Sequence, residues 1–283
     1  MSVLSIQSEV VRGHVGNAAA RFALQLRGHD ALCIPTVLLS SHAGYARVAG
    51  EAVSGARIAS LVDALDANGW LAACDGVLSG YLASADQAEV IADAVRRVRR
   101  AKACAIYCLD PVFGDEAGAY AEPAIAEAMA KHLLPLADIV TPNRFELASL
   151  AGVPVRDAAD ARLAAGRLGR PIVLATSIPV GIPAGIPAGS DRIGALAASG
   201  GEAWFAHAPR IAQVPHGAGD LLAALFLAHR LDGAAIREAL GASLAATDRV
   251  LFRSMGFEEM RLVAEQDAIR HPPDTGRIRI EKL

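Results

Sequence analysis

The chain contains little lysine, cysteine or aromatic side chain. Lysine occurs only at positions 102, 131 and 282, and aromatic residues make up 5% of the 283 residues. The formal net charge of −3 argues against a broad nucleic-acid surface. The four cysteines lie inside apolar runs without the paired spacing of a zinc site. We therefore expect buried thiols in a reducing compartment.

Targeting segments and two common nucleotide motifs are also missing. The first apolar run, 3–6, is too short for a signal peptide. The uncharged stretch 171–190 is long enough to cross a membrane, but prolines at 171, 179, 183 and 187 exclude one continuous helix. The absence of G-x-G-x-x-G after the first apolar run and of G-x-x-x-x-G-K-[ST] argues against a Rossmann dehydrogenase and a P-loop enzyme. We expect a cytoplasmic protein with neither a membrane nor a nucleic-acid partner.

Short apolar runs alternate with segments of helical period along most of the chain. Hydrophobic residues make up 53% of it, enough for a large core. Strands are predicted at 3–7, 31–39, 76–81, 103–109, 138–141 and 171–176. Helices are predicted at 17–27, 56–68, 86–99, 123–134 and 144–151. This alternation is typical of a mostly parallel sheet covered by helices on both faces, and no composition shift marks a second domain. A single α/β domain spanning 1–283 is therefore predicted.

The pattern changes after residue 176. An antiparallel pair is predicted at 192–198 and 202–208, followed by helices at the glycine turn near 217, at 234–253 and at 258–268. Between these parts, 178–189 holds three copies of Ile-Pro-(Val/Ala)-Gly. We expect this low-complexity stretch to form a surface loop.

A glycine-rich turn stands directly before the most apolar helical run. The turn is His216–Gly217–Ala218–Gly219–Asp220. Free amides at a helix N-terminus attract an anion such as a transferring phosphate, and a carboxylate placed there can accept a proton. Phosphoryl transfer to an alcohol requires both. A glycine-Asp helix start is also common as a plain cap, so this turn does not decide the function alone.

Polar residues follow the predicted strands at two further places. Asp110 comes directly after the strand 103–109, while Asn143 and Glu146 come after the next strand and open a helix. The carboxyl ends of parallel strands meet at one edge of a sheet, where oxygen ligands and phosphate suit Mg²⁺. The alternative is that Asp110 and Asn143 only cap turns.

Small polar residues and an aromatic follow the first three predicted strands. Ser8 follows the first, His42 and Ala43 follow the second, and Tyr81 ends the third. Such a set suits a small planar ring held by stacking and a few hydrogen bonds. Taken singly, His42 and Tyr81 are also typical of ordinary surface or core positions.

Five stretches, in order along the chain, resemble the pyridoxal kinases of the ribokinase-like superfamily. They are 5–8 with 13–17, 40–45, 110–115, 136–143 with Glu146, and 217–220, and the tail 261–267 is similar as well. The resemblance implies a three-layer α/β/α fold. It also implies ATP-dependent phosphorylation of the 5′-hydroxymethyl group of pyridoxal to pyridoxal 5′-phosphate, a step of vitamin B6 salvage. Such kinases use Mg²⁺, often with a monovalent cation such as K⁺, and are homodimers.

The resemblance also implies a role for each matching residue. Asp220 takes the place of the catalytic base, with amides of Gly217, Ala218 and Gly219 around the γ-phosphate. Asp110, Asn143 and Glu146 match positions that organise Mg²⁺-ATP, and of these Asp110 and Glu146 are on the metal side. Thr141 and Thr176 match positions on the nucleotide side. The matching positions for the substrate ring are Ser8, His42, Ala43 and Tyr81, with Asp220 at its alcohol.

Two departures from the family pattern leave other functions open. Ala43 stands where relatives carry a hydroxyl residue, which removes one possible hydrogen bond to the substrate. The proline-glycine stretch 178–189 has an unusual sequence and length for a loop beside the nucleotide. A hydroxymethylpyrimidine kinase is one alternative, because that substrate is a similar ring with a primary alcohol. A non-catalytic vitamin-binding protein on the same fold is the other, although a binder has no need of a base beside the phosphate.

Overall fold

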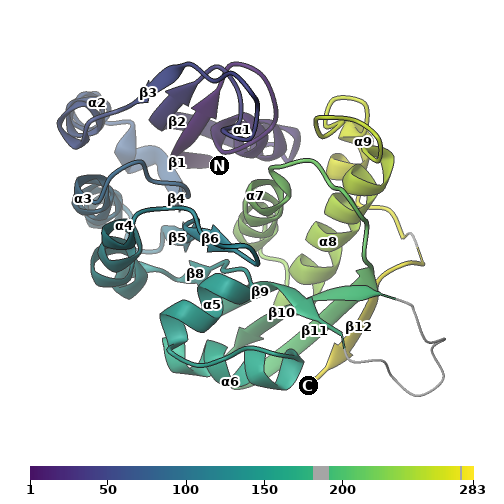
Figure 1. Cartoon of the computed structure of the whole chain (residues 1–283). Coiled ribbons are helices and arrows are strands. Elements are labelled where there is room, and N and C mark those ends of the chain that lie inside the picture. Colours follow the sequence, from purple (N-terminus) through teal and green to yellow (C-terminus); the bar gives the residue numbers. More distant parts are fainter. Residues whose placement is uncertain (181–190, 275) are drawn as a thin grey trace.

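The computed structural model describes residues 1–180, 191–274 and 276–283. Within these residues, one ten-stranded sheet separates two layers of helices (Figure 1). Its strand order is β12-β11-β10-β9-β8-β5-β4-β1-β2-β3. The strands are β1 (Ser2–Val10), β2 (Asp30–Leu39), β3 (Gly50–Ala52), β4 (Cys74–Ser79), β5 (Ile106–Leu109), β8 (Ile139–Val140), β9 (Ile172–Pro179), β10 (Arg192–Ser199), β11 (Glu202–Pro209) and β12 (Arg279–Lys282). This architecture confirms the predicted α/β class.

The centre of the sheet is parallel and buried on both faces. The strands from β2 across to β9 run parallel, whereas β3 and β10–β12 add antiparallel pairs at the two edges. Residues 3–7 of β1 are all buried, so inner and outer positions are equally covered. Helices therefore cover both sides of this strand, and its two buried polar residues are paired, with Gln7 Nε2 donating to Ser5 Oγ at 2.9 Å.

The helices divide into two layers that bury separate apolar cores. One layer packs α1 (Asn17–Leu26), α7 (Ala218–Leu231) and α8 (Ile236–Arg253) together, with α9 (Gln266–Arg270) beside α8. The other holds α2 (Gly55–Ala67), α3 (Asp86–Ala101), α4 (Pro123–Ala128), α5 (Arg144–Ala151) and α6 (Ala158–Leu168), as Figure 1 shows. Residues 221–229 of α7 are all buried, which explains why that helix is apolar on every side. No described helix is long and apolar enough to cross a membrane.

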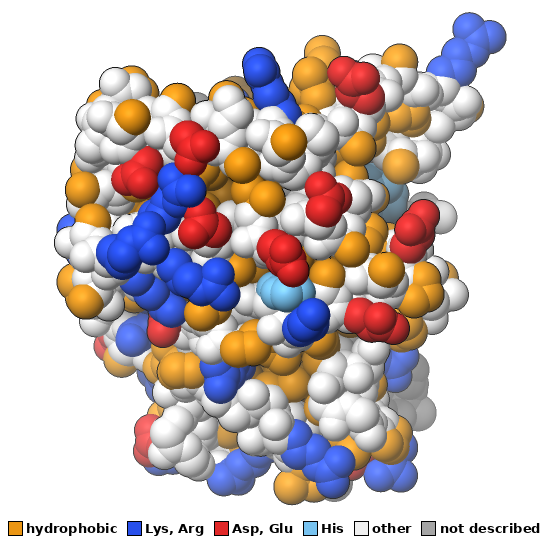
Figure 2. All heavy atoms as spheres, turned by 90° about the vertical axis from the view of Figure 1, so that its left-hand side faces the viewer, with side chains coloured by type: hydrophobic (Ala, Val, Ile, Leu, Met, Phe, Trp, Pro, Cys, Tyr) orange, Lys and Arg blue, Asp and Glu red, His pale blue; other side chains and the backbone are white. Residues whose placement is uncertain are grey.

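Positive side chains gather on the outer face of the second layer, close to acidic ones (Figure 2). On α3, Arg97 pairs through Nη1 with Asp63 at 2.6 Å and through Nε with Asp93 at 2.6 Å. Exposed pairs of this kind add little stability. They do, however, balance the charge of the arginine-rich end of α3.

The predicted helix at 258–268 is wrong for most of its length. Only Gln266–Arg270 is helical, and the preceding residues run as an irregular segment. Met260 and Leu262 are buried while Arg261 and Val263 between and after them are exposed. Residues 262–265 form a turn closed by the Glu265 amide, which donates to the Arg261 carbonyl at 3.0 Å, and the helix begins only after it.

Several elements were not predicted. They are α6, the edge strands β3 and β12, and a small hairpin of β6 (Gly114–Asp115) and β7 (Gly118–Ala119). The predicted loop at 178–189 begins too early, because Ile178 and Pro179 pair with β10 as the end of β9. Its residues 181–189 lie outside the described residues. The expectation of buried thiols holds for Cys74 and Cys108, whereas Cys33 is half-buried and Cys104 is exposed.

Candidate active site

The candidate site lies at the carboxyl ends of the central strands, where α5 and α7 begin. Asp110 directly follows β5, Asn143 is the N-cap of α5, and Asp220 stands in the first turn of α7. Asn143 lines one cavity with Ala218 and Gly219 of α7, and the Thr141 hydroxyl, two residues before Asn143, donates to Asp110. The expected meeting of these strand ends at one edge of the sheet is thus confirmed.

Glu146 is held by backbone N–H groups and not by a cation. Its Oε1 accepts from the amides of Phe113 at 3.1 Å and Gly114 at 3.4 Å, and its Oε2 accepts from Asn143 at 2.9 Å. The Asn143 side chain in turn accepts from the Glu146 amide at 3.0 Å, which completes a capping box. Burial, followed by the charge of Asp110, raises the pKa of Glu146 to about 8.

Asp110 is buried with one neutral partner. The Thr141 hydroxyl donates to its Oδ1 at 2.7 Å, and only 5% of the residue is exposed. Burial, followed by the charge of Asp220, raises its pKa to about 7. In the described chain, no Lys, Arg or His side chain forms an ion pair with Asp110 or Glu146. Buried carboxylates without a counter-charge suit a bound cation.

This donor set fits Mg²⁺ only as an ion shared with phosphate. No group of three or more His, Cys, Asp or Glu side chains in the described residues is arranged to hold a metal alone. Mg²⁺ commonly keeps several waters and is bound by one or two carboxylates plus substrate phosphates. Two carboxylates with raised pKa values beside an anion site meet that description.

The turn before α7 leaves room for a ligand because of its glycines. Gly217 has φ +97°, and a Cβ at this position would lie 1.9 Å from the His14 carbonyl oxygen. Above Gly219, by contrast, no atom lies within 4 Å of the place a Cβ would take. The first turn of α7 is therefore uncovered at Gly219, and the start of a helix is where an anion binds most favourably.

A cavity of about 430 Å³ extends from this turn toward β9, β10, β11 and α8. Ala218 and Gly219 line one part of it, and Asn143 and Thr176 line another. Of the residues expected around ATP, Asn143 and Thr176 thus share one cavity with the glycine turn, whereas Asp110, Thr141 and Glu146 are not among its lining residues. Thr141 lies deeper, against Asp110.

Asp220 faces the loop between β1 and α1. Gly217, in the same helix turn, packs directly on this loop, since a Cβ on it would lie 1.9 Å from the His14 carbonyl oxygen, and Asp220 itself is half-buried. Burial raises the pKa of Asp220 to about 6, and the backbone N–H of Gly16 acts in the opposite direction. Gly16 is also packed against Ser8, since a Cβ on Gly16 would lie 2.2 Å from Ser8 Oγ. Ser8 and Asp220 are therefore brought to the same loop.

The second loop on this side carries His42. Its ring stacks on His216 at 3.8 Å between centroids, and its Nδ1 accepts from the Gly44 amide at 3.1 Å. Tyr81 is half-buried, and its carbonyl accepts from the Thr36 hydroxyl at 2.7 Å. Ala43 is exposed. The structure thus places His42 next to the first residue of the glycine turn.

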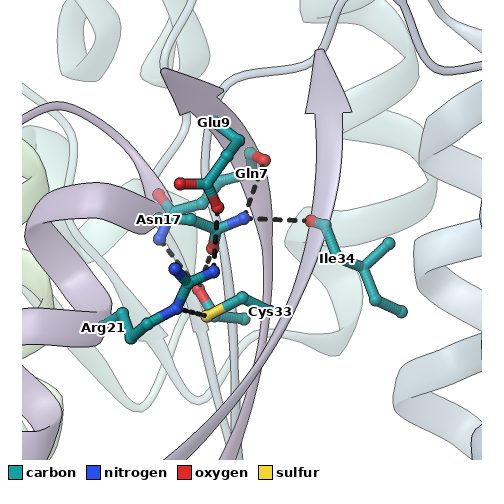
Figure 3. Close-up of polar contacts among 7 residues, drawn as sticks. Gln7, Glu9, Asn17, Arg21, Cys33 and Ile34 are labelled. Carbon is teal, nitrogen blue, oxygen red and sulfur yellow. Dashed lines mark hydrogen bonds and ion pairs between the residues drawn. The ribbon is translucent and has the colours of Figure 1, made fainter. Parts of the chain in front are cut away.

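A buried polar network fixes the end of β1 that carries Ser8 (Figure 3). Asn17 donates through Nδ2 to the carbonyl oxygens of Gln7 at 3.1 Å and Ile34 at 3.2 Å. Its Oδ1 accepts from Ser5 Oγ at 2.8 Å. Buried hydrogen bonds of this kind are costly to break, so they hold the loop 13–16 against the two strands.

Sequence reasoning missed two residues of the site. His216 was quoted only as the start of the glycine turn, although it stacks on His42. Ser177 lines the cavity with φ +58°, an unfavourable backbone conformation for a serine. Strained backbone of this kind gathers at ligand sites, but the sequence around Ser177 carries no signal of it.

Known proteins resemble this chain over nearly its whole length. A family model described as phosphomethylpyrimidine kinase matches residues 58–261. A pyridoxal kinase of Rubrobacter xylanophilus is 40% identical over 279 residues, which cover 96% of this chain and 95% of its own. A pyridoxal kinase of Deinococcus radiodurans is 41% identical, and the match covers 96% of this chain and 93% of the relative. The chain belongs to the pyridoxal kinase family.

The fold agrees with that membership. The solved structure of the pyridoxal kinase from Leishmania donovani in complex with ADP and pyridoxamine is 29% identical to this chain, with a TM-score of 0.88. The match covers 100% of this chain and 99% of the other. The predicted ribokinase-like α/β architecture is thereby confirmed.

Proposed function

We propose that this chain transfers the γ-phosphoryl group of ATP to the 5′-hydroxymethyl group of pyridoxal, giving pyridoxal 5′-phosphate. One observation carries the proposal. The first turn of α7 packs through Gly217 on the loop between β1 and α1 and lines the cavity of about 430 Å³ through Ala218 and Gly219, so its Asp220 stands between that loop and the cavity. A carboxylate between an acceptor pocket and an anion site suits in-line transfer to an alcohol.

In the proposed reaction, Asp220 accepts the proton of the substrate alcohol as the new O–P bond forms. The bond between the γ-phosphorus and its bridging oxygen breaks, and ADP leaves with that electron pair. With a pKa of about 6, Asp220 is mostly ionised at neutral pH and can take the proton. Activity should therefore fall as the pH drops below this value. The amides of Gly217, Ala218 and Gly219 would face the transferred phosphoryl group.

We also propose which residues bind Mg²⁺, the nucleotide and the substrate ring. Asp110 and Glu146 would hold Mg²⁺ through water next to the ATP phosphates, where the ion neutralises developing charge. Asn143, Thr141 and Thr176 would support the nucleotide. The role of a monovalent cation such as K⁺ and the homodimer stay predictions that rest on the resemblance. The single domain and the cytoplasmic location stay predictions that rest on the composition and on the sequence motifs. Ser8, His42, Ala43 and Tyr81 would surround the pyridine ring.

Hydroxymethylpyrimidine is the second candidate substrate. The matching family model is described by a phosphorylated pyrimidine, and Ala43 offers no hydroxyl to the ring. The relatives at 40% and 41% identity, however, are named for pyridoxal. We therefore expect pyridoxal to be the better substrate.

A coupled assay of ADP formation decides between these functions. The purified protein is given ATP and Mg²⁺ with pyridoxal, with hydroxymethylpyrimidine, or with neither. We expect kcat/KM to be at least tenfold higher for pyridoxal. A higher value for the pyrimidine would overturn the substrate, and no alcohol-dependent ADP with either would favour the non-catalytic binding protein.

A further inference from the structure

The irregular segment after α8 touches the loop after β1, which packs on Ser8, and the loop after β2, which carries His42. We call these two the acceptor-pocket loops, because the proposed function puts the substrate ring beside them. Tyr45, on the loop after β2, donates its hydroxyl to Glu259 Oε1 at 2.6 Å. Arg12, on the loop after β1, pairs through Nη2 with Glu258 Oε2 at 2.9 Å. Residues near the C-terminal end of the chain thus bridge two loops that lie near its beginning.

Glu259 makes the closer contact of the two acidic residues. Its carboxylate packs directly against Gly13, since a Cβ on Gly13 would lie 2.7 Å from Oε2 and 2.9 Å from Oε1. Gly13 also has φ +106°, a conformation that other residues rarely adopt. The loop after β1 is therefore shaped to admit this carboxylate. The Arg12–Glu258 pair, by contrast, is exposed by 65% and 70% and should contribute little.

Glu259 also acts on the histidines of both loops. Burial lowers the pKa of His14 and of His42, and in each case the Glu259 charge acts in the opposite direction. His42 in turn stacks on His216, which leads into the glycine turn. A continuous set of contacts thus runs from Glu259 through the loop after β2 to the phosphate side of the site.

We propose that Glu259 is a positioning residue that holds the two acceptor-pocket loops together around the substrate ring. This inference rests on the proposed function, which puts the substrate ring beside these loops. One loop carries Gly16, which lies beside Ser8, and the other carries His42. It assigns a role to a segment that lies outside the transfer machinery itself. A small displacement of a positioning group can lower the rate strongly without touching the chemistry.

The test compares Glu259→Ala, Tyr45→Phe and, as a matched control, Glu258→Ala in steady-state kinetics with pyridoxal and ATP varied separately. For Glu259→Ala we expect the KM for pyridoxal to rise about tenfold or more while the KM for ATP stays within about twofold. Tyr45→Phe should raise the pyridoxal KM less, and the double variant should be no worse than Glu259→Ala. Glu258→Ala should match the wild type.

An unchanged pyridoxal KM in Glu259→Ala, or an equal rise in both KM values, would overturn the proposal. If Glu259→Ala does not fold, as judged by thermal melting, Tyr45→Phe decides alone, because it removes one oxygen only. Its pyridoxal KM must then rise by at least about twofold. A wild-type protein that forms no ADP with pyridoxal would instead overturn the proposed function, so the two failures are distinguishable.

Discussion

Acidic side chains have opposite surroundings at the two ends of the central sheet. At the amino end, Asp75 of β4 accepts from Lys102 and from the Ser2 amide, and Asp138 before β8 pairs with Arg99. Burial opposes the charge of Asp75, but its hydrogen bonds outweigh burial and lower its pKa. At the carboxyl end, Asp110 and Glu146 have neutral partners and raised pKa values.

The difference shows which end of the sheet is built for a ligand. Paired carboxylates stabilise the folded chain by themselves. Buried carboxylates without a counter-charge cost free energy at neutral pH, and a bound cation would offset that cost. Such groups lower the stability of the protein without ligands, but they allow the site to bind a cation. The following predictions test that contrast from the largest expected effect to the smallest.

Gly217→Ala should have the largest effect, because the carboxyl end depends on a close backbone approach. A Cβ there would meet the His14 carbonyl oxygen, in a conformation with positive φ. We expect the free energy of unfolding to fall by about 2–4 kcal/mol and activity by about 100-fold or more. Urea unfolding and the ADP assay measure both.

Gly219→Ala is the matched control for that substitution. No atom lies within 4 Å of the place its Cβ would take, and its φ is not positive. Stability should therefore stay within about 0.5 kcal/mol, while the KM for ATP rises because the methyl group enters the anion site. Equal losses of stability in the two variants would contradict the described geometry.

Asp110→Asn should stabilise the protein without ligands at pH 8. The folded pKa is about 7 against 3.8 for the ordinary group, so the folded chain holds the proton more tightly. Stability therefore falls as the pH rises from about 4 to about 7, and the loss is complete above that range. The variant should gain about 1–3 kcal/mol at pH 8 and little at pH 4, measured by urea unfolding. A loss of stability at pH 8 would contradict this, because it would mean that the Asp110 carboxylate has a stabilising partner in the folded protein.

Asp75→Asn should change the stability less than Asp110→Asn does, and in the opposite direction. Its pKa is lowered in the folded chain, so its contribution is present above the ordinary value of 3.8 and is lost as the pH falls through the folded value. We expect the variant to lose about 1 kcal/mol at pH 8. Urea unfolding at pH 8 measures this. A higher free energy of unfolding in the variant would contradict the contrast between the amino and carboxyl ends of the sheet.

The part of the site built from strand ends could be predicted from the sequence. Asp110, Asn143 and Asp220 follow strands or open helices, and parallel topology brings such positions to one edge. Their burial could not be predicted, because it depends on residues that cover them from other elements.

The contacts between distant segments could not be predicted either. The periodicity at 258–268 indicated a helix, but Glu259 meets Tyr45 and Gly13, and Met260 and Leu262 enter the core. These tertiary contacts outweigh the local preference for a helix. The stack of His42 on His216 is likewise set by the fold and leaves no mark in either local sequence.

Single-turnover formation of pyridoxal 5′-phosphate by Asp220→Ala tests the central claim most directly. The variant is mixed with pyridoxal and saturating Mg²⁺-ATP, and the product is quantified after rapid quenching. The account predicts a rate at least about 1,000-fold below that of the wild type, with ADP affinity within a few-fold. A rate close to that of the wild type would show that Asp220 is not the proton acceptor.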